Sequence, residues 1–166
     1  ELFREYGINL LDSISSTNIE EGRKHAKELG YPFVIKIQVP VGGRGKAGGI
    51  QKCQNDDEFE LKYPQVMDLT IKGEKARAIL LEKMADIKKE LYLSLFLNRS
   101  KRCYTIIASV EGGVEIESVK NQIIKEIGLG EVSDELAKEV AKEMELEGKT
   151  ADGFIDTLRS EERRVG

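Results

Sequence analysis

The glycine-rich segment at residues 42–49 constrains this chain most, because it places five glycines and two cations in eight positions. Glycine adopts positive φ and lets backbone amides approach a ligand closely, while arginine and lysine supply positive charge. Residues 33–39 before the segment and 50–53 after it are apolar runs that predict strands. We therefore expect a strand, a loop that suits a phosphate group, and a second strand.

Three other interpretations of this loop compete with phosphate binding. Gly43, Gly45 and Gly48 satisfy the GxGxxG spacing of dinucleotide-binding folds, but that motif opens a helix and a strand is expected here. A Walker A loop needs Ser or Thr directly after Gly-Lys to reach magnesium, and this chain has Ala47. A hairpin connection that binds nothing stays open, although such a turn needs only one or two glycines.

Three charged residues in or beside apolar runs are candidates for nucleotide contacts. Lys36 lies inside the first run, where alternation places it on one face with Val34 and Gln38. A buried ammonium without a partner is costly, so Lys36 either reaches solvent or meets an anion such as a phosphate. Glu82 and Glu90 lie at strand boundaries, and a carboxylate can accept hydrogen bonds from two ribose hydroxyls or from an adenine amino group. Each glutamate alone is more typical of a surface acid, so the case for a nucleotide contact comes from their combination with the loop.

The rest of the chain alternates strands and helices without the regular βαβ rhythm of a doubly wound sheet, so the α+β class is predicted. Apolar runs predict strands at residues 10–15, 76–82, 90–97 and 103–110. Periodicity and capping residues predict helices at residues 1–6, 19–29, 56–69, from 133 onward and at 150–162. Ser16 and Thr17 offer N-cap oxygens to the second helix. The charged run 160–166 follows a helix with no obvious sheet to pack on, which suggests an artificial or truncated end.

Composition and single residues exclude several classes of function. The 166 residues include 30 acidic and 26 basic side chains without a long block of either sign, so no nucleic acid partner is expected. Uncharged stretches are too short to span a bilayer and no signal segment is visible, which predicts a cytoplasmic protein without a membrane partner. Cys53 and Cys103 lack metal-ligand spacing and are expected to be reduced. His25 is expected on a helix surface, and no nucleophile at a recognisable spacing supports triad chemistry.

Three stretches of the chain resemble signature stretches of the β subunit of ADP-forming succinate–CoA ligase, which is a branch of the ATP-grasp proteins. These stretches are residues 33–49, 79–94 and 108–117, and their order and separation match as well. The similarity extends to about Leu158. It implies an α+β ATP-grasp fold with two lobes and the nucleotide cleft between them. The implied organisation is one incomplete ATP-grasp domain at 1–166, with 11–82 as the first lobe and 1–10 plus 83–166 as the second.

The resemblance also implies which residues bind the nucleotide. In that family a strand lysine contacts phosphate and base, and a glycine loop closes over the phosphates. One glutamate lies beside the adenine, an alanine adds a backbone contact nearby, and a second glutamate holds the ribose. The residues that inherit these roles are, in chain order, Lys36, Gly43, Arg44, Gly45, Glu82, Ala85 and Glu90. The turn at residues 111–113 resembles a family loop near the active site without a defined role.

The implied reaction converts ATP, succinate and coenzyme A to ADP, phosphate and succinyl-CoA through an acyl phosphate and a phosphohistidine. The α subunit of the ligase is the expected partner and supplies the histidine, so no catalytic residue is expected in this chain. Mg²⁺ is expected with ATP, but its ligands and the C-terminal CoA-ligase domain are expected beyond residue 166, so the chain alone should be inactive. A related ligase for malate, acetate or citrate, or a non-catalytic nucleotide-binding fragment, stays open.

Overall fold

The structure is a computed structural model that describes residues 2–165 and divides into two compact units. The first unit is Leu11–Asp86, and the second unit combines Glu1–Leu10 with Ile87–Gly166. Glu1 and Gly166, which the sequence assigns to the first helix and to the charged end, lie outside the described residues.

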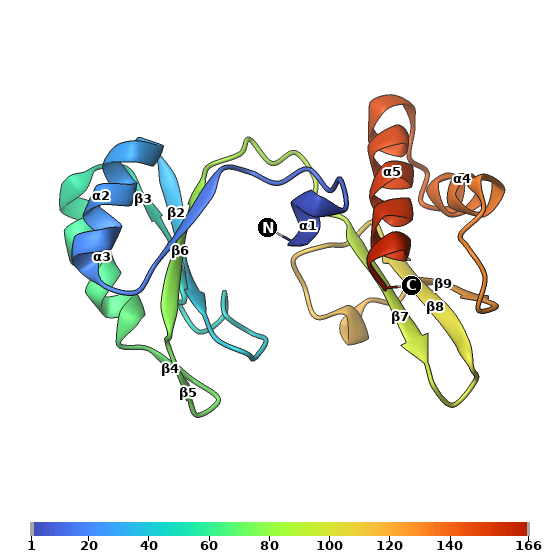
Figure 1. Ribbon diagram of the computed structural model, residues 1–166, viewed down its shortest axis with the longest axis horizontal. Coiled ribbons are helices and arrows are strands. Elements are labelled where there is room, and N and C mark those ends of the chain that lie inside the picture. The colour runs from blue at the N-terminus through green and yellow to red at the C-terminus, as the bar shows by residue number, and fades with distance from the viewer. Residues whose placement is uncertain (1, 166) are drawn as a thin grey trace. The chain divides into compact units, whose positions relative to one another are not determined.

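The first unit is a four-stranded antiparallel sheet with two helices on one face (Figure 1). The strands pair in the order β1-β6-β2-β3, and β4 and β5 form a separate hairpin. The amide of Lys83 donates to the carbonyl of Asp12 at 2.8 Å, so this unit continues beyond Glu82, where the first lobe was expected to end. Its elements are β1 (Ser13–Ser16), α2 (Ile19–Leu29), β2 (Phe33–Gln38), β3 (Ile50–Cys53), α3 (Asp56–Met67), β4 (Thr70–Ile71), β5 (Glu74–Lys75) and β6 (Ala78–Lys83).

Side chains of β2 alternate between the core and a half-buried face of the sheet. The core face carries three residues without exposed surface: Phe33, Ile35 and Ile37. They pack with α2, α3 and the inward side chains of β6. The opposite face carries the partly buried residues predicted to share it: Val34, Lys36 and Gln38. Burial of the apolar set therefore determines that Lys36 lies on the face that the helices do not cover.

Helix α2 is capped by Asn18, so the prediction that Ser16 or Thr17 caps it is wrong. The side-chain oxygen of Asn18 accepts from the amide of Glu21 at 2.9 Å. Ser16 is instead the last residue of β1, and its buried hydroxyl lies 3.0 Å from the hydroxyl of Tyr63. Tyr63 donates to the carbonyl of Asn18 at 2.9 Å, and burial raises the pKa of its hydroxyl. These bonds fasten α3 to the start of α2.

The second unit is a three-stranded antiparallel sheet in the order β7-β8-β9, packed against α4 and α5 (Figure 1). Leu95 of β7 and Ile106 of β8 lie in its core with Val140 of α4 and Leu158 of α5. Its elements are α1 (Leu2–Glu5), β7 (Tyr92–Asn98), β8 (Cys103–Ser109), the 3-10 helix η1 (Ile116–Ser118), β9 (Ile123–Ile127), α4 (Asp134–Glu143) and α5 (Gly148–Val165).

Strand β9 was not predicted, because a lysine interrupts its apolar alternation. Ile123 and Ile127 pack against the core, and Lys125 lies between them on the same side of the strand. Glu139 and Glu143 of α4 accept hydrogen bonds from the Lys125 ammonium, and these bonds raise its pKa. An ion pair between strand and helix thus replaces an apolar contact.

The expectation that the last helix has no sheet to pack on is wrong. Phe154 and Leu158 of α5 are buried in the same core as the strands of the second unit. Beyond them, the guanidinium of Arg164 lies 5.5 Å from the centre of the Phe3 ring, within the range of a cation–π contact. The charged end of the chain therefore holds α1 against α5 rather than standing apart.

The single histidine and the two cysteines have structural surroundings. Cys53 is buried, Cys103 is partly buried, and both thiols are free. His25 lies on α2 as expected but is only partly exposed, and its Nδ1 is buried without a hydrogen bond among the described residues. Within residues 2–165, no helix combines the length and apolarity that crossing a bilayer requires.

We expect Gly22→Ala to lower the free energy of unfolding by about 1–3 kcal/mol, because the added methyl group would overpack the interface of α2 with α3. Its carbon would lie 2.9 Å from the rings of Phe59 and Tyr63. Gly153→Ala in α5 is the matched control, because Gly153 has no neighbour within 4 Å there. The control should gain about 0.5–1 kcal/mol from helix propensity. Denaturant unfolding followed by circular dichroism measures both changes, and a stabilised Gly22→Ala variant would contradict this packing.

We also expect the stability of the first unit to fall as pH rises from about 9 to about 11. Burial raises the pKa of the Cys53 thiol from 9.0 to about 11. The unfolded chain therefore loses this proton first, and the stabilisation that is complete below pH 9 disappears as pH rises through the folded pKa. Urea titrations across this range should show a shallower decline for Cys53→Ala and the original slope for Cys103→Ala. Equal slopes in all three proteins would rule out this role of Cys53.

Candidate functional site

Lys36 and Glu82 form an ion pair on the face of the first sheet that the helices leave uncovered. Glu82 of β6 pairs in register with Val34 of β2, two residues from Lys36, so the side chains meet diagonally across neighbouring strands. The Lys36 ammonium donates to Oε1 of Glu82, and the two side chains are 29% and 21% exposed. The sequence leaves open whether Lys36 reaches solvent or meets an anion; in the structure Lys36 meets a carboxylate of the same unit.

The glycine loop closes directly beyond this pair. Lys36 lies opposite Ile50, the first residue of β3, and the amide of Ile37 donates to the carbonyl of Gly49 at 2.8 Å. A Cβ atom on Gly49 would collide with the side chain of Ile37 and lie 3.0 Å from the carbonyl oxygen of Arg44. The base of the loop therefore needs glycine so that the chain can turn back onto β2.

The loop leaves four consecutive amides unused. The amides of Ala47, Gly48 and Gly49 donate to carbonyls within the loop, at 3.1, 3.1 and 2.8 Å. The amides of the four residues 42–45 make no hydrogen bond to any residue from 2 to 165. The last three of them, Gly43, Arg44 and Gly45, are the loop residues that the sequence singles out. Consecutive backbone donors in a turn form a concave surface that suits an anion.

The remaining predicted site residues lie in the segment after β6. Ala85 is exposed near the end of the first unit, and Glu90 belongs to the second unit, just before β7. In the second unit, the amide of Gly112 donates to the carbonyl of Glu90 at 3.0 Å. This contact was not predicted. Its only sequence signal is the pair of adjacent glycines after a buried strand.

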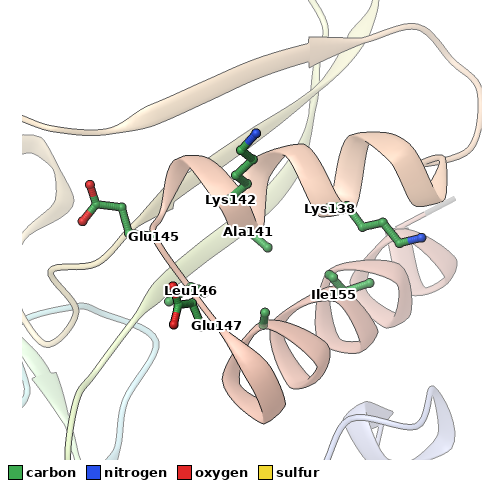
Figure 2. Close-up of a pocket in the computed structure, with 8 residues that line it drawn as sticks. Lys138, Ala141, Lys142, Glu145, Leu146, Glu147 and Ile155 are labelled. Atoms are coloured by element: carbon green, nitrogen blue, oxygen red, sulfur yellow. The ribbon is translucent and has the colours of Figure 1, made fainter.

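Two surface cavities lie elsewhere, in the second unit. One of about 640 Å³ is formed where α4 meets α5 (Figure 2). Ala141 and Ile155 lie between the helices, whereas Lys142 and Glu145 point outward. A second cavity, of about 500 Å³, also includes Glu145 and is lined by Gln122 and other residues of the same unit. Neither cavity includes a glycine loop or a predicted site residue, so we do not assign the nucleotide to them.

No group of three or more His, Cys, Asp and Glu side chains comes together within the part of the chain that is described. The ion pairs found there instead join one lysine or arginine to one or two carboxylates, as Lys125 does with Glu139 and Glu143. The described side chains therefore form no metal site with three or more such ligands.

Known proteins resemble this chain over most of its length. The β subunit of ADP-forming succinate–CoA ligase from Rubrobacter xylanophilus is 41% identical over 119 residues, which are 72% of this chain and 31% of that protein. The same subunit from Pyrobaculum arsenaticum is 40% identical over 119 residues, again 72% of this chain and 31% of that protein. The resemblance seen in the sequence is thus confirmed, and the chain spans about a third of the length of these relatives.

Solved structures share the fold at lower identity. Dinucleotide forming acetyl-coenzyme A synthetase 1 from Ca. Korarchaeum cryptofilum, in complex with coenzyme A, Ca-AMPCP and HgCl+, has a TM-score of 0.81 at 20% identity, covering 97% of this chain and 75% of that chain. ATP citrate lyase from Methanothrix soehngenii has a TM-score of 0.69 at 21% identity, covering 98% of this chain and 40% of that chain. At these identities the likeness shows the fold alone.

A model of a protein family also matches this chain and identifies its family. The model, described as an ATP-grasp domain, matches residues 1–160, which is nearly the whole chain. The α+β class and the ATP-grasp fold predicted from the sequence are therefore confirmed. With a glycine loop that offers unused amides beside a paired lysine, and with this match, the chain belongs to the ATP-grasp family.

Proposed function

We propose that this chain is the nucleotide-binding part of the β subunit of an ADP-forming succinate–CoA ligase. Together with an α subunit that carries the phosphohistidine, the whole enzyme converts ATP, succinate and coenzyme A to ADP, phosphate and succinyl-CoA. The observation that carries the proposal is the position of Lys36, held by Glu82 beside a loop whose amides at residues 42–45 are unused. The identity of 40–41% to β subunits of this ligase supports the choice of reaction.

Lys36 binds the phosphates of ATP in this proposal. Its side chain is only 29% exposed, so water competes weakly and a charge-assisted hydrogen bond to a phosphate oxygen gains strength. Glu82 orients the ammonium through Oε1, and its second oxygen has no partner among residues 2–165. That oxygen accepts a hydrogen bond from the amino group of adenine, next to the backbone contact assigned to Ala85.

The glycine loop, which follows the end of β2 that carries Lys36, also holds the phosphates. The amides of Gly43, Arg44 and Gly45 donate to phosphate oxygens, and the positive φ of Gly43, at 87°, gives the backbone a turn that a side chain would oppose. The guanidinium of Arg44 adds positive charge where a triphosphate is most negative. Such fixed donors stabilise charge that develops during phosphoryl transfer without having to reorganise.

Mg²⁺ accompanies ATP in the proposed reaction and neutralises charge on its phosphates. Its preferred ligands are carboxylate and carbonyl oxygens in octahedral geometry. Because residues 2–165 bring no cluster of such side chains together, we assign no ligand of this ion to the chain. The residues named above bind and orient the nucleotide, and no step of the chemistry is attributed to a side chain of this chain.

Lys36→Ala should weaken ATP binding by about 1.5–3 kcal/mol, or roughly ten- to a hundredfold in Kd, because a charge-assisted contact is lost. Lys36→Gln should weaken it similarly while retaining a donor to Glu82. Lys52→Ala is the matched control, since Lys52 lies opposite Val34 on the same face of the sheet. Isothermal titration with ATP measures each Kd. Equal losses of ATP affinity in Lys36→Ala and Lys52→Ala would mean that ATP binding depends only on the positive charge of this face and not on a contact with Lys36.

The choice of reaction is tested with the complete reading frame, expressed together with the α subunit. We expect ADP release from ATP that requires both succinate and coenzyme A and is matched by formation of succinyl-CoA. Malate, acetate and citrate in place of succinate are the controls, since each has a related ligase. If ADP release is faster with one of these acids than with succinate, that acid replaces succinate as the proposed substrate.

A further inference from the structure

Glu90 lies directly on two adjacent glycines of the second unit. We call Gly112 and Gly113 the glycine pair; it follows Glu111 after strand β8. The amide of Gly112 donates to the carbonyl of Glu90 at 3.0 Å, which fixes the backbone of Glu90 against the pair. The carboxylate of Glu90 folds over Gly113, and its Oε2 occupies the space that a Cβ atom on Gly113 would need.

Neither glycine tolerates a side chain in this arrangement. A Cβ atom on Gly112 would lie 2.7 Å from the carbonyl carbon of Glu90 and 2.9 Å from its carbonyl oxygen. These are backbone atoms, so rotation of a side chain cannot relieve the clash. Gly113 has a φ of 72°, a conformation that favours glycine, and a Cβ atom there would also lie 3.1 Å from Cδ of Glu90.

The packing restricts Glu90 while leaving its carboxylate available. Neither oxygen of this carboxylate forms a hydrogen bond or ion pair with a residue between 2 and 165. A glutamate exposed to solvent normally samples many rotamers, and ordering it at the moment of binding costs about 1.5–2 kcal/mol. Contact with the glycine pair removes part of that freedom beforehand, so a ligand need not do so.

We propose that the glycine pair is a positioning platform that holds the Glu90 carboxylate ready to accept hydrogen bonds from both vicinal hydroxyls of a ribose. The inference rests on the proposed function and on the ribose contact that the family resemblance implies for Glu90. It adds that selection of ribose over deoxyribose depends on Gly112 and Gly113, which touch no part of the nucleotide themselves. They act through Glu90.

Sugar selectivity measures this role, because a site built to bind a hydroxyl discriminates strongly against a ligand that lacks it. The 166-residue chain is titrated with ATP and with 2′-deoxy-ATP. We expect the original protein to bind ATP about ten- to a hundredfold more tightly, the effect of one charge-assisted hydrogen bond. In Gly113→Ala and in Glu90→Ala this ratio should fall towards one. The double variant should show no further change, because the glycine acts only through the carboxylate.

Gly148→Ala is the matched control for backbone strain. Gly148 also has a positive φ, of 52°, and has no neighbour within 4 Å. Its variant should keep the ribose selectivity of the original protein. If Glu90→Ala leaves the ratio unchanged, the ribose role of Glu90 within the proposed function is wrong. If Glu90→Ala lowers the ratio but Gly113→Ala does not, the positioning role of the glycine pair is wrong.

A second measurement needs neither nucleotide nor variant. Scalar couplings of the Glu90 side chain, measured by nuclear magnetic resonance on the labelled chain, report its rotamers. One dominant rotamer is expected if the glycine pair holds the carboxylate. Averaging over several rotamers overturns the inference, even if substitutions at Gly113 prevent folding or if ATP does not bind.

Discussion

The antiparallel pairing of β2 with β6 determines where the charged groups of the first unit lie. Six residue pairs join these strands, and the five apolar side chains on their inward face have no exposed surface. A slip by one residue would bring Lys36 into the core and expose its apolar neighbours, so the register is strongly favoured. The same register places Glu82 within reach of Lys36. Burial of apolar residues on one face thus builds an ion pair on the other.

Close approach of the backbone is the second constraint, and it occurs where phosphate and ribose are proposed to bind. Gly49 lets the loop return onto Ile37, and Gly112 and Gly113 lie against Glu90. In each place a Cβ atom would meet atoms of another segment at less than van der Waals distance. The glycines therefore permit contacts that position other groups, in addition to turning the chain.

Alternation of apolar residues and helix-ending glycines predicted those parts of the fold that depend on neighbouring residues in the sequence. Alternation in β2 located the core and the face of Lys36, and Gly30 marked the end of α2, where its φ is 73°. Prediction failed where a distant partner decides the outcome. Lys125 interrupts the pattern of β9 because two glutamates of α4 compensate its charge. The contact of Glu90 with the glycine pair likewise joins segments whose proximity no periodicity reveals.

The ion pair of Lys36 with Glu82 has a consequence for any anion that approaches this lysine. The charge of Lys36 is already matched, so an incoming phosphate competes with a carboxylate of the protein instead of meeting an unopposed cation. The net gain is the difference between two attractions, and added salt weakens both of them. Affinity for the anion should therefore respond less to ionic strength than the charge of the ligand suggests.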